Sequence, residues 1–264
     1  MPTSNIAPVC SIHYLDPNSS GSPSVLLLHG LGATGESWGL QIPALIEAGY
    51  RPIAPDARGF GKSTYPGGSH TIEAMAGDMA ALLDRLGAEA AHVVGISMGG
   101  TLALSLALHH PQKVDKLVLV NTFSSLRPDK LSIWLYFAFR LVLVHTLGLE
   151  TQAKAVAGRI FPAPEQNEMR RVLVAQICQA DPWGYRATMR ALARFNVVER
   201  LGEIRAPTLV ITGADDTTIP PKNQKTLVER IPGARQIVIS NAGHAVTAQQ
   251  PEAFNQEMCA FLKF

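Results

Sequence analysis

A serine flanked by glycines is the residue of this chain best placed for nucleophilic chemistry. Ser97 lies within residues 95–100 (GISMGG), directly after an apolar run and at the start of a small-residue helical pattern that ends at His109. At such a strand-to-helix turn, a G-x-S-x-G sequence strains the serine backbone and exposes the hydroxyl at a helix N-terminus, where developing negative charge is stabilised. A chance turn of glycine and serine is the alternative, and the flanking strand and helix make it unfavourable.

A serine hydroxyl is a weak nucleophile at neutral pH, so it requires a general base. Of the eight histidines, we predict His244 for this role, because its loop lies between the last apolar run, at residues 237–239, and the final helical pattern. His29 precedes a candidate oxyanion loop, and we expect its ring to brace that loop. The other histidines are expected to lie at the surface or to take part in packing.

A carboxylate must orient the imidazole and stabilise its charged form. Residues 212–220 (TGADDTTIP) follow the penultimate apolar run, where the chain order Ser, Asp, His places the acid. Asp215 or Asp216 could serve, and the other aspartate is then expected to stabilise the turn or cap a helix.

The oxyanion of a tetrahedral intermediate needs backbone N–H donors, each worth about 3 kcal/mol in the transition state. We predict the N–H groups of Met98 and Leu31, the latter in residues 29–32 (HGLG) after the first long apolar run. An ordinary strand-ending turn is the alternative for that loop. Residues 56–63 (DARGFGKS) are expected to be structural, with Arg58 binding carbonyls or the Asp56 carboxylate.

Neither a metal nor a cofactor is predicted. Residues 59–63 lack the spacing of a phosphate-binding loop, and no group of residues resembles a zinc site. The net charge of +2, with scattered Lys and Arg, gives no reason to expect nucleic-acid binding.

Short apolar runs alternate with helical patterns, which predicts a doubly wound parallel sheet covered on both faces. The runs lie at residues 25–28, 52–54, 92–96, 117–120, 209–211 and 237–239. The helical patterns lie at residues 37–48, 72–86, 98–109, 221–230 and 251–262. An early run at residues 9–15 is expected to add an antiparallel edge strand.

Residues 124–201 contain no strand candidate and are too many for a loop, so we predict a helical cap over the carboxyl edge of the sheet. Residues 1–123 and 202–264 then form the core domain. The most apolar stretch, residues 131–147, is too short to span a bilayer and is interrupted by Arg140 and His145.

Three widely spaced cysteines and an N-terminus without a signal-peptide pattern favour a cytoplasmic protein without a membrane partner. We expect a monomer or a homodimer.

Taken together, the chain resembles the α/β-hydrolase superfamily. The resemblance rests on residues 29–32, 56–63, 95–100, 213–220 and 243–244. It is strongest to the capped esterase/lactonase branch, which includes 3-oxoadipate enol-lactonases and cofactor-free haloperoxidase-like esterases. The resemblance implies a mostly parallel eight-stranded sheet with a helical cap inserted after the sixth strand. The family pattern G-x-x-D-x-x-x-P, placed on Gly213 and Pro220, selects Asp216.

The predicted function is therefore hydrolysis of a small-molecule ester or lactone with a short or medium acyl group, through an acyl-enzyme. The residues predicted to bind the substrate are Trp38, Trp134, Phe137 and Trp183, which could instead pack the cap helices. A C–C bond hydrolase of ring-cleavage products, or a slow-turnover receptor of the same fold, remains as an alternative. Many relatives carry a glutamate where this chain has Gln249 and Gln250, a difference expected to alter helix capping.

Overall fold

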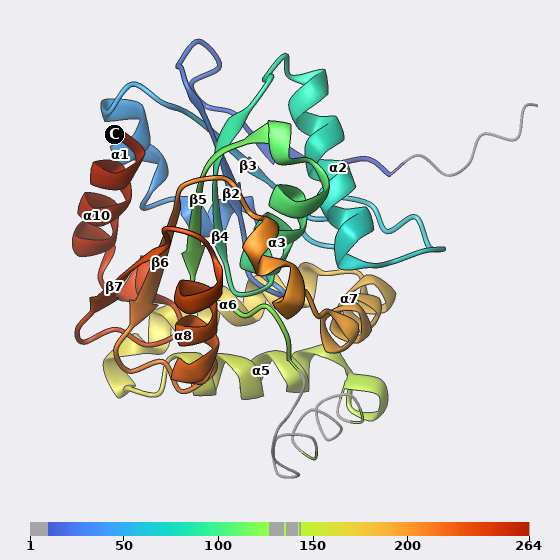
Figure 1. Ribbon diagram of the computed structural model, residues 1–264. Helices are drawn as coiled ribbons and strands as arrows, with labels where there is room; N and C mark the ends of the chain where they lie inside the picture. Colours follow the sequence, from blue (N-terminus) through green and yellow to red (C-terminus); the bar gives the residue numbers. More distant parts are fainter. Residues whose placement is uncertain (1–9, 127–134, 136–141, 143, 264) are drawn as a thin grey trace, which may run out of the picture.

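A mostly parallel sheet runs through the centre of the protein (Figure 1). The computed structural model describes residues 10–126, 135, 142 and 144–263. The strands, in the order β1-β3-β2-β4-β5-β6-β7 across the sheet, are β1 (Tyr14–Leu15), β2 (Ser24–Leu28), β3 (Arg51–Pro55), β4 (Ala91–Ile96), β5 (Val114–Val120), β6 (Thr208–Gly213) and β7 (Arg235–Ile239). Strand β1 pairs antiparallel with β3, and the other described pairs are parallel. The predicted fold class is confirmed.

Two details of the topology correct the prediction. The described part of the chain forms seven strands in place of eight, and the helical insertion follows the fifth of them, β5. Within the described part of the expected edge strand, only the two residues of β1 join the sheet. The backbone N–H groups of Ser11 and His13 donate instead to the hydroxyl oxygens of Thr64 and Ser63, both at 2.9 Å. Side chains of a loop therefore hold this segment in place of a strand.

Both faces of the sheet are covered, because alternate residues of a strand point to opposite sides. In β2, Leu26 and Leu28 pack into one core cluster with α2 (Ile72–Arg85) and α3 (Met98–His109). Val25 and Leu27 pack into a second cluster with α1 (Ile42–Glu47) and α10 (Pro251–Lys263). Figure 1 shows these two pairs of helices on opposite sides of the sheet. The double burial explains why the strands are continuous apolar runs.

The remaining helices follow the predicted patterns with one exception. Helix α8 (Pro221–Arg230) has the predicted bounds, and the short α9 (Val246–Gln249) precedes α10. The expected helix at residues 37–48 is divided into a 3₁₀ turn, Gly35–Trp38, and α1. Proline has no N–H and fits only the first turn of a helix, so Pro43 makes α1 begin at Ile42. In the described part of the chain, no helix has the length and apolar character needed to cross a bilayer.

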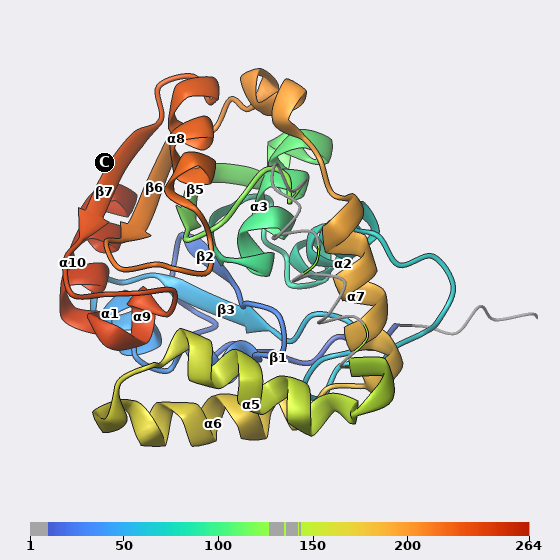
Figure 2. The ribbon, with the colours of Figure 1, turned by 90° about the horizontal axis from the view of Figure 1, so that it is seen from below.

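Three helices of the insertion lie together at one end of the sheet (Figures 1 and 2). They are α5 (Gly148–Ile160), α6 (Asn167–Gln179) and α7 (Pro182–Arg194). The two ends of the insertion meet, because Ser125 and Asn196 form an isolated antiparallel bridge and Val197 N–H donates to the Ser124 carbonyl at 2.9 Å. All three helices fall within residues 124–201, the predicted cap, whose boundaries remain a prediction.

A histidine connects α7 with the core. His70 Nε2 lies 2.7 Å from the hydroxyl of Thr188, which donates its own hydrogen to the Gly184 carbonyl at 2.9 Å. Nε2 must therefore carry the hydrogen, so the ring is neutral with Nδ1 unprotonated. Nδ1 is buried without a hydrogen-bond partner. Burial, followed by the positive charge of Arg58, lowers the pKa of His70 to about 4, against a smaller opposing effect of Asp78.

This histidine should make the protein less stable in acid. Because its pKa in the folded chain lies below the ordinary value of 6.5, the unfolded chain binds more protons between these two values. The free energy of unfolding is expected to fall as the pH decreases from about 6.5 to about 4, and less steeply in His70→Gln. Urea unfolding midpoints across this pH range provide the measurement. Burial also lowers the pKa of His29 and His92, so part of the slope should remain in the variant. An unchanged slope would contradict the assignment.

Candidate active site

Ser97 forms a sharp turn between β4 and α3. Its backbone has φ 54° and ψ −114°, in the left-handed half of conformational space that side chains other than glycine rarely occupy. The turn is possible because glycines surround it. A side chain at position 99 would collide with the Leu28 carbonyl, and one at position 100 would collide with Thr122. The predicted strained turn is thus observed, with the serine at the N-terminus of α3.

The neighbouring strand β5 anchors this turn. Ser97 N–H donates to the Val120 carbonyl at 2.9 Å, and the Thr122 hydroxyl donates to the Ser97 carbonyl at 2.6 Å. Both backbone polar groups of the serine are therefore held from one side, which leaves its side chain free to face the cavity.

The structure brings His244 and Asp216 together. His244 Nδ1 lies 3.0 Å from Asp216 Oδ2, and their side chains are 9% and 2% exposed. The other carboxylate oxygen, Oδ1, accepts hydrogen bonds from the N–H groups of Thr218 at 2.7 Å and Ile219 at 3.2 Å. These two bonds fix the carboxylate in the orientation in which it meets the imidazole. Asp215, the alternative acid, is exposed, and its backbone N–H donates to the Ala242 carbonyl.

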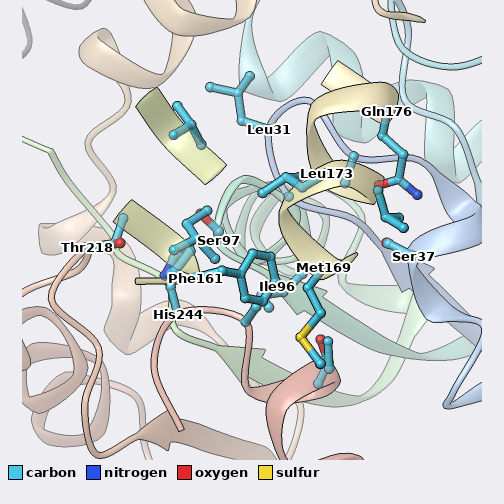
Figure 3. Close-up of a pocket in the computed structure, with 18 of the residues that line it drawn as sticks. Leu31, Ser37, Ile96, Ser97, Phe161, Met169, Leu173, Gln176, Thr218 and His244 are labelled. Carbon is cyan, nitrogen blue, oxygen red and sulfur yellow. The ribbon is translucent and has the colours of Figure 1, made fainter. Parts of the chain in front are cut away.

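Ser97 and His244 line the same cavity, which has a volume of about 720 Å³ (Figure 3). The walls come from the loop after β2, the serine turn, the cap helices and the histidine loop. Most lining side chains are apolar, and they include Ile96, Phe123, Leu126, Phe161, Met169, Val172, Leu173 and Leu192. The predicted nucleophile and base therefore lie at the wall of an apolar cavity between core and cap.

The two predicted oxyanion donors lie on either side of Ser97. Met98 is the first residue of α3, so its N–H has no partner within the helix. Leu31 lines the cavity in a tight turn that is closed by a bond from Ala33 N–H to the Gly30 carbonyl, at 3.1 Å. Such a turn uses the N–H of its fourth residue and leaves that of its second residue unpaired. Both N–H groups are thus available to an oxyanion.

His29 braces this loop, as predicted. Its Nδ1 donates to the Gly30 carbonyl at 2.8 Å, and its Nε2 accepts from Ala57 N–H at 2.9 Å. Burial lowers its pKa, which keeps the ring in the neutral form that this arrangement requires. The edge of the His29 ring contacts Phe60, which in turn contacts Tyr185 of α7. A chain of rings therefore connects the oxyanion loop to the cap.

Asp56 and Arg58 separate, contrary to one of the expected roles of the arginine. Arg58 forms its ion pair with Asp78 of α2, at 2.5 Å, and also donates to the Ser69 carbonyl. Asp56 accepts from the backbone N–H groups of Gly35 and Lys62 instead, at 2.8 and 3.0 Å. Residues 56–63 thus have the structural role that was predicted for them.

The aromatic residues predicted to bind substrate do not form the described walls of the cavity. Trp38 is 1% exposed and packs in the core cluster between the sheet and α10. Trp183 is 66% exposed, and Arg186 lies over its ring. Trp134 and Phe137 lie outside the described residues. Smaller side chains of α6 and α7 line the cavity in their place.

Two residues that the sequence analysis missed contact the site. Asn121 follows β5 and binds the loop that carries His244, and its signal was a polar residue at the end of a buried apolar run. Gln249, whose expected effect was on helix capping, accepts a hydrogen bond from Gly243 N–H at 2.8 Å. It therefore stabilises the histidine loop.

The geometry can be compared with known proteins. The family described as alpha/beta hydrolase fold matches residues 23–143 and 171–251, which include the serine turn, Asp216 and His244. The chain belongs to the α/β-hydrolase family. This α/β-hydrolase is 37% identical over 253 residues, 92% of each chain, to the protein named "Putative carbamate hydrolase RutD" from Caulobacter sp. strain K31.

Solved structures of two further proteins are similar. The enol-lactonase from Burkholderia xenovorans LB400 matches with a TM-score of 0.88 and 27% identity over 97% of each chain. The bromoperoxidase from Bacillus anthracis matches with a TM-score of 0.87 and 26% identity, over 97% of this chain and 96% of that one. The predicted resemblance to the esterase/lactonase branch is confirmed, and the chain is a hydrolase.

Proposed function

We propose that this α/β-hydrolase cleaves carboxylic esters through a covalent intermediate on Ser97. The observation that carries the proposal is the hydrogen bond between His244 and Asp216 at the wall of a cavity that Ser97 also lines. Nucleophile, base and orienting acid are the three parts that hydroxyl-based acyl transfer requires.

In the first step, His244 Nε2 removes the proton of the Ser97 hydroxyl, and the oxygen attacks the ester carbonyl. The carbonyl electron pair moves to its oxygen, and the N–H groups of Met98 and Leu31 stabilise the resulting negative charge. Asp216 accepts a hydrogen bond from Nδ1–H and so stabilises the imidazolium that forms. The intermediate then collapses, and the alcohol leaves with the proton from His244.

In the second step, water hydrolyses the acyl-enzyme. His244 takes a proton from the water, the hydroxide oxygen attacks the acyl carbonyl, and the Ser97 oxygen leaves with that proton. The carboxylic acid is released, and the enzyme returns to its starting state. These steps use side chains and backbone groups of this chain alone.

The cavity favours esters whose acyl group is a neutral hydrocarbon. Among the described lining residues, Glu36 and Glu168 are the acidic ones, both are exposed, and Lys or Arg does not occur. The apolar walls gain free energy when they bury methylene groups, and the volume of about 720 Å³ admits short and medium chains. We therefore propose small-molecule esters of this kind, or lactones with a comparable ring, as substrates.

A carbamate is the second candidate, because that word is in the name of the 37% identical relative. A carbamate presents a carbonyl that Ser97 could attack in the same way. Its small polar group would, however, leave the apolar walls without hydrocarbon to bury, so we rank the ester first. A C–C bond hydrolase or a slow-turnover receptor, both expected to use the same serine, is distinguished by the experiments below.

The chain-length dependence of ester hydrolysis tests the substrate class. With p-nitrophenyl esters from acetate to octanoate, kcat/KM should rise by up to about fourfold per added methylene while the chain is buried. It should then level off or fall once the chain no longer fits the cavity. Lactones of increasing ring size, a carbamate and a vinylogous diketone are measured in parallel. Turnover of the carbamate or the diketone without turnover of any ester would contradict the proposal.

A fluorophosphonate probe separates an enzyme from a receptor. One molecule should bind covalently per chain at Ser97, with loss of activity, and esters should turn over many times before labelling. Labelling accompanied by a single slow burst of product would indicate a receptor, and absence of labelling would contradict both readings.

A further inference from the structure

Asn121 occupies an unusual position at the centre of the site. It follows β5, the strand that lies between β4, which ends before Ser97, and β6, which ends before the loop of Asp216. Its side chain and backbone are fully buried, and its φ of 42° lies in the left-handed region. Asparagine tolerates that region better than most residues. The strand itself supplies neither nucleophile, base nor acid.

The amide of Asn121 joins two loops that are far apart in the sequence. Nδ2 donates to the carbonyls of Gly243 and His244, each at 2.9 Å. Oδ1 accepts from Gly213 N–H, also at 2.9 Å. Both amide hydrogens and one oxygen lone pair are therefore used, and a buried amide that lost these partners would be strongly disfavoured.

These bonds act on the backbone of the proposed base. Asp216 fixes the imidazole of His244 from Nδ1, and Asn121 fixes the carbonyl of the same residue. Gly213 begins the turn that leads to Asp216, whose own N–H donates to the Gly213 carbonyl at 3.2 Å. The next residue along the chain, Thr122, binds the Ser97 carbonyl. The end of β5 thus contacts the loops of all three side chains.

We propose that Asn121 is a positioning residue, which keeps the His244 loop and the Asp216 loop in the register that directs the imidazole at the Ser97 hydroxyl. The proposal rests on the proposed ester hydrolysis. A shift of about 1 Å in such an arrangement is enough to lower a rate by up to about 100-fold. Asn121 does not itself line the cavity, so its effect should fall on catalysis more than on substrate binding.

Two variants test the proposal. Asn121→Gly accepts the positive φ but removes all three bonds. Asn121→Asp keeps the shape of the side chain and the acceptor for Gly213, but it turns a carboxylate toward the two carbonyls. In both variants kcat for p-nitrophenyl butyrate should fall by roughly 10- to 100-fold, with KM nearly unchanged. The rate of fluorophosphonate labelling should fall in parallel.

A matched control comes from the same loop as His244. Asn241 also has a positive φ, 55°, but it is exposed. Asn241→Gly should retain the native kcat. A second measurement is the downfield proton resonance of the His244–Asp216 hydrogen bond, identified by its absence in His244→Ala. It should broaden or disappear in the Asn121 variants and persist in Asn241→Gly.

The outcomes separate this proposal from the proposed function. If the native enzyme is labelled at Ser97 and a folded Asn121 variant keeps native kcat and the resonance, the positioning role is refuted and esterase function stands. Reduced thermal stability with an unchanged kcat would also refute it, because that result indicates packing alone. Should Asn121→Gly fail to fold, Asn121→Asp decides. If the native enzyme neither reacts with the probe nor hydrolyses esters, the proposed function fails first.

Discussion

Ser97→Ala should remain folded and lose ester hydrolysis by on the order of 10⁵- to 10⁶-fold, because removal of the nucleophile leaves only the oxyanion donors and substrate binding. The expected loss is this large since His244 and Asp216 have no other hydroxyl to activate in the described site. Initial rates with p-nitrophenyl butyrate, at high enzyme concentration, measure the residual activity. Mass spectrometry after fluorophosphonate treatment should find no adduct on the variant.

Ser97→Gly provides the control for folding. Alanine keeps the strain of the positive φ at this position, whereas glycine adopts that conformation without a steric clash. Both variants should be inactive, and Ser97→Gly should unfold at the higher temperature of the two. Substantial turnover by either variant would remove Ser97 from the mechanism, whatever the remaining activity of the other residues.

Asp216→Asn should lower kcat by about 10³- to 10⁴-fold, by analogy with the acid of a serine-protease triad. The amide that replaces the carboxylate can donate to His244 Nδ1, which favours the tautomer with the hydrogen on Nε2. That nitrogen could then no longer accept the serine proton. Steady-state kinetics measure the loss, and KM should change little because Asp216 is buried behind the imidazole.

Asp215→Asn is the matched control, because it makes the same chemical change at the neighbouring position. Asp215 is exposed, and its hydrogen bond to Ala242 uses the backbone N–H, which the substitution keeps. Its kcat should stay within about threefold of native, as for a surface substitution. Equal losses from the two substitutions would show that the acid has been assigned wrongly.

The serine turn and the strand order could be predicted from the sequence because local constraints decide them. A glycine-flanked serine after a buried strand leaves few backbone conformations, and Ser97 takes the strained one. Continuous apolar runs are compatible with a sheet covered on both faces, and this is how β2 packs. The choice of Asp216 over Asp215 needed the family pattern, since two adjacent aspartates in a turn look alike in composition.

The cavity walls could not be predicted, because the packing of large aromatic side chains depends on the angles at which helices meet. Trp38 lies in the core and Trp183 at the surface, although both were expected to contact substrate. Amphipathic patterns indicate which residues are apolar, but not whether a side chain covers a cavity, a neighbouring helix or solvent.

What the sequence determined by itself was the nucleophile, the base and the alternation of strands and helices, each encoded within a few neighbouring residues. The tertiary structure alone decided what Asn121 contacts, because its partners at Gly213 and His244 are 92 and 123 positions away along the chain. It also decided which aspartate reaches the imidazole. Hydrogen bonds over such separations depend on how the sheet brings its loops together, and a linear pattern of residues carries little information about that.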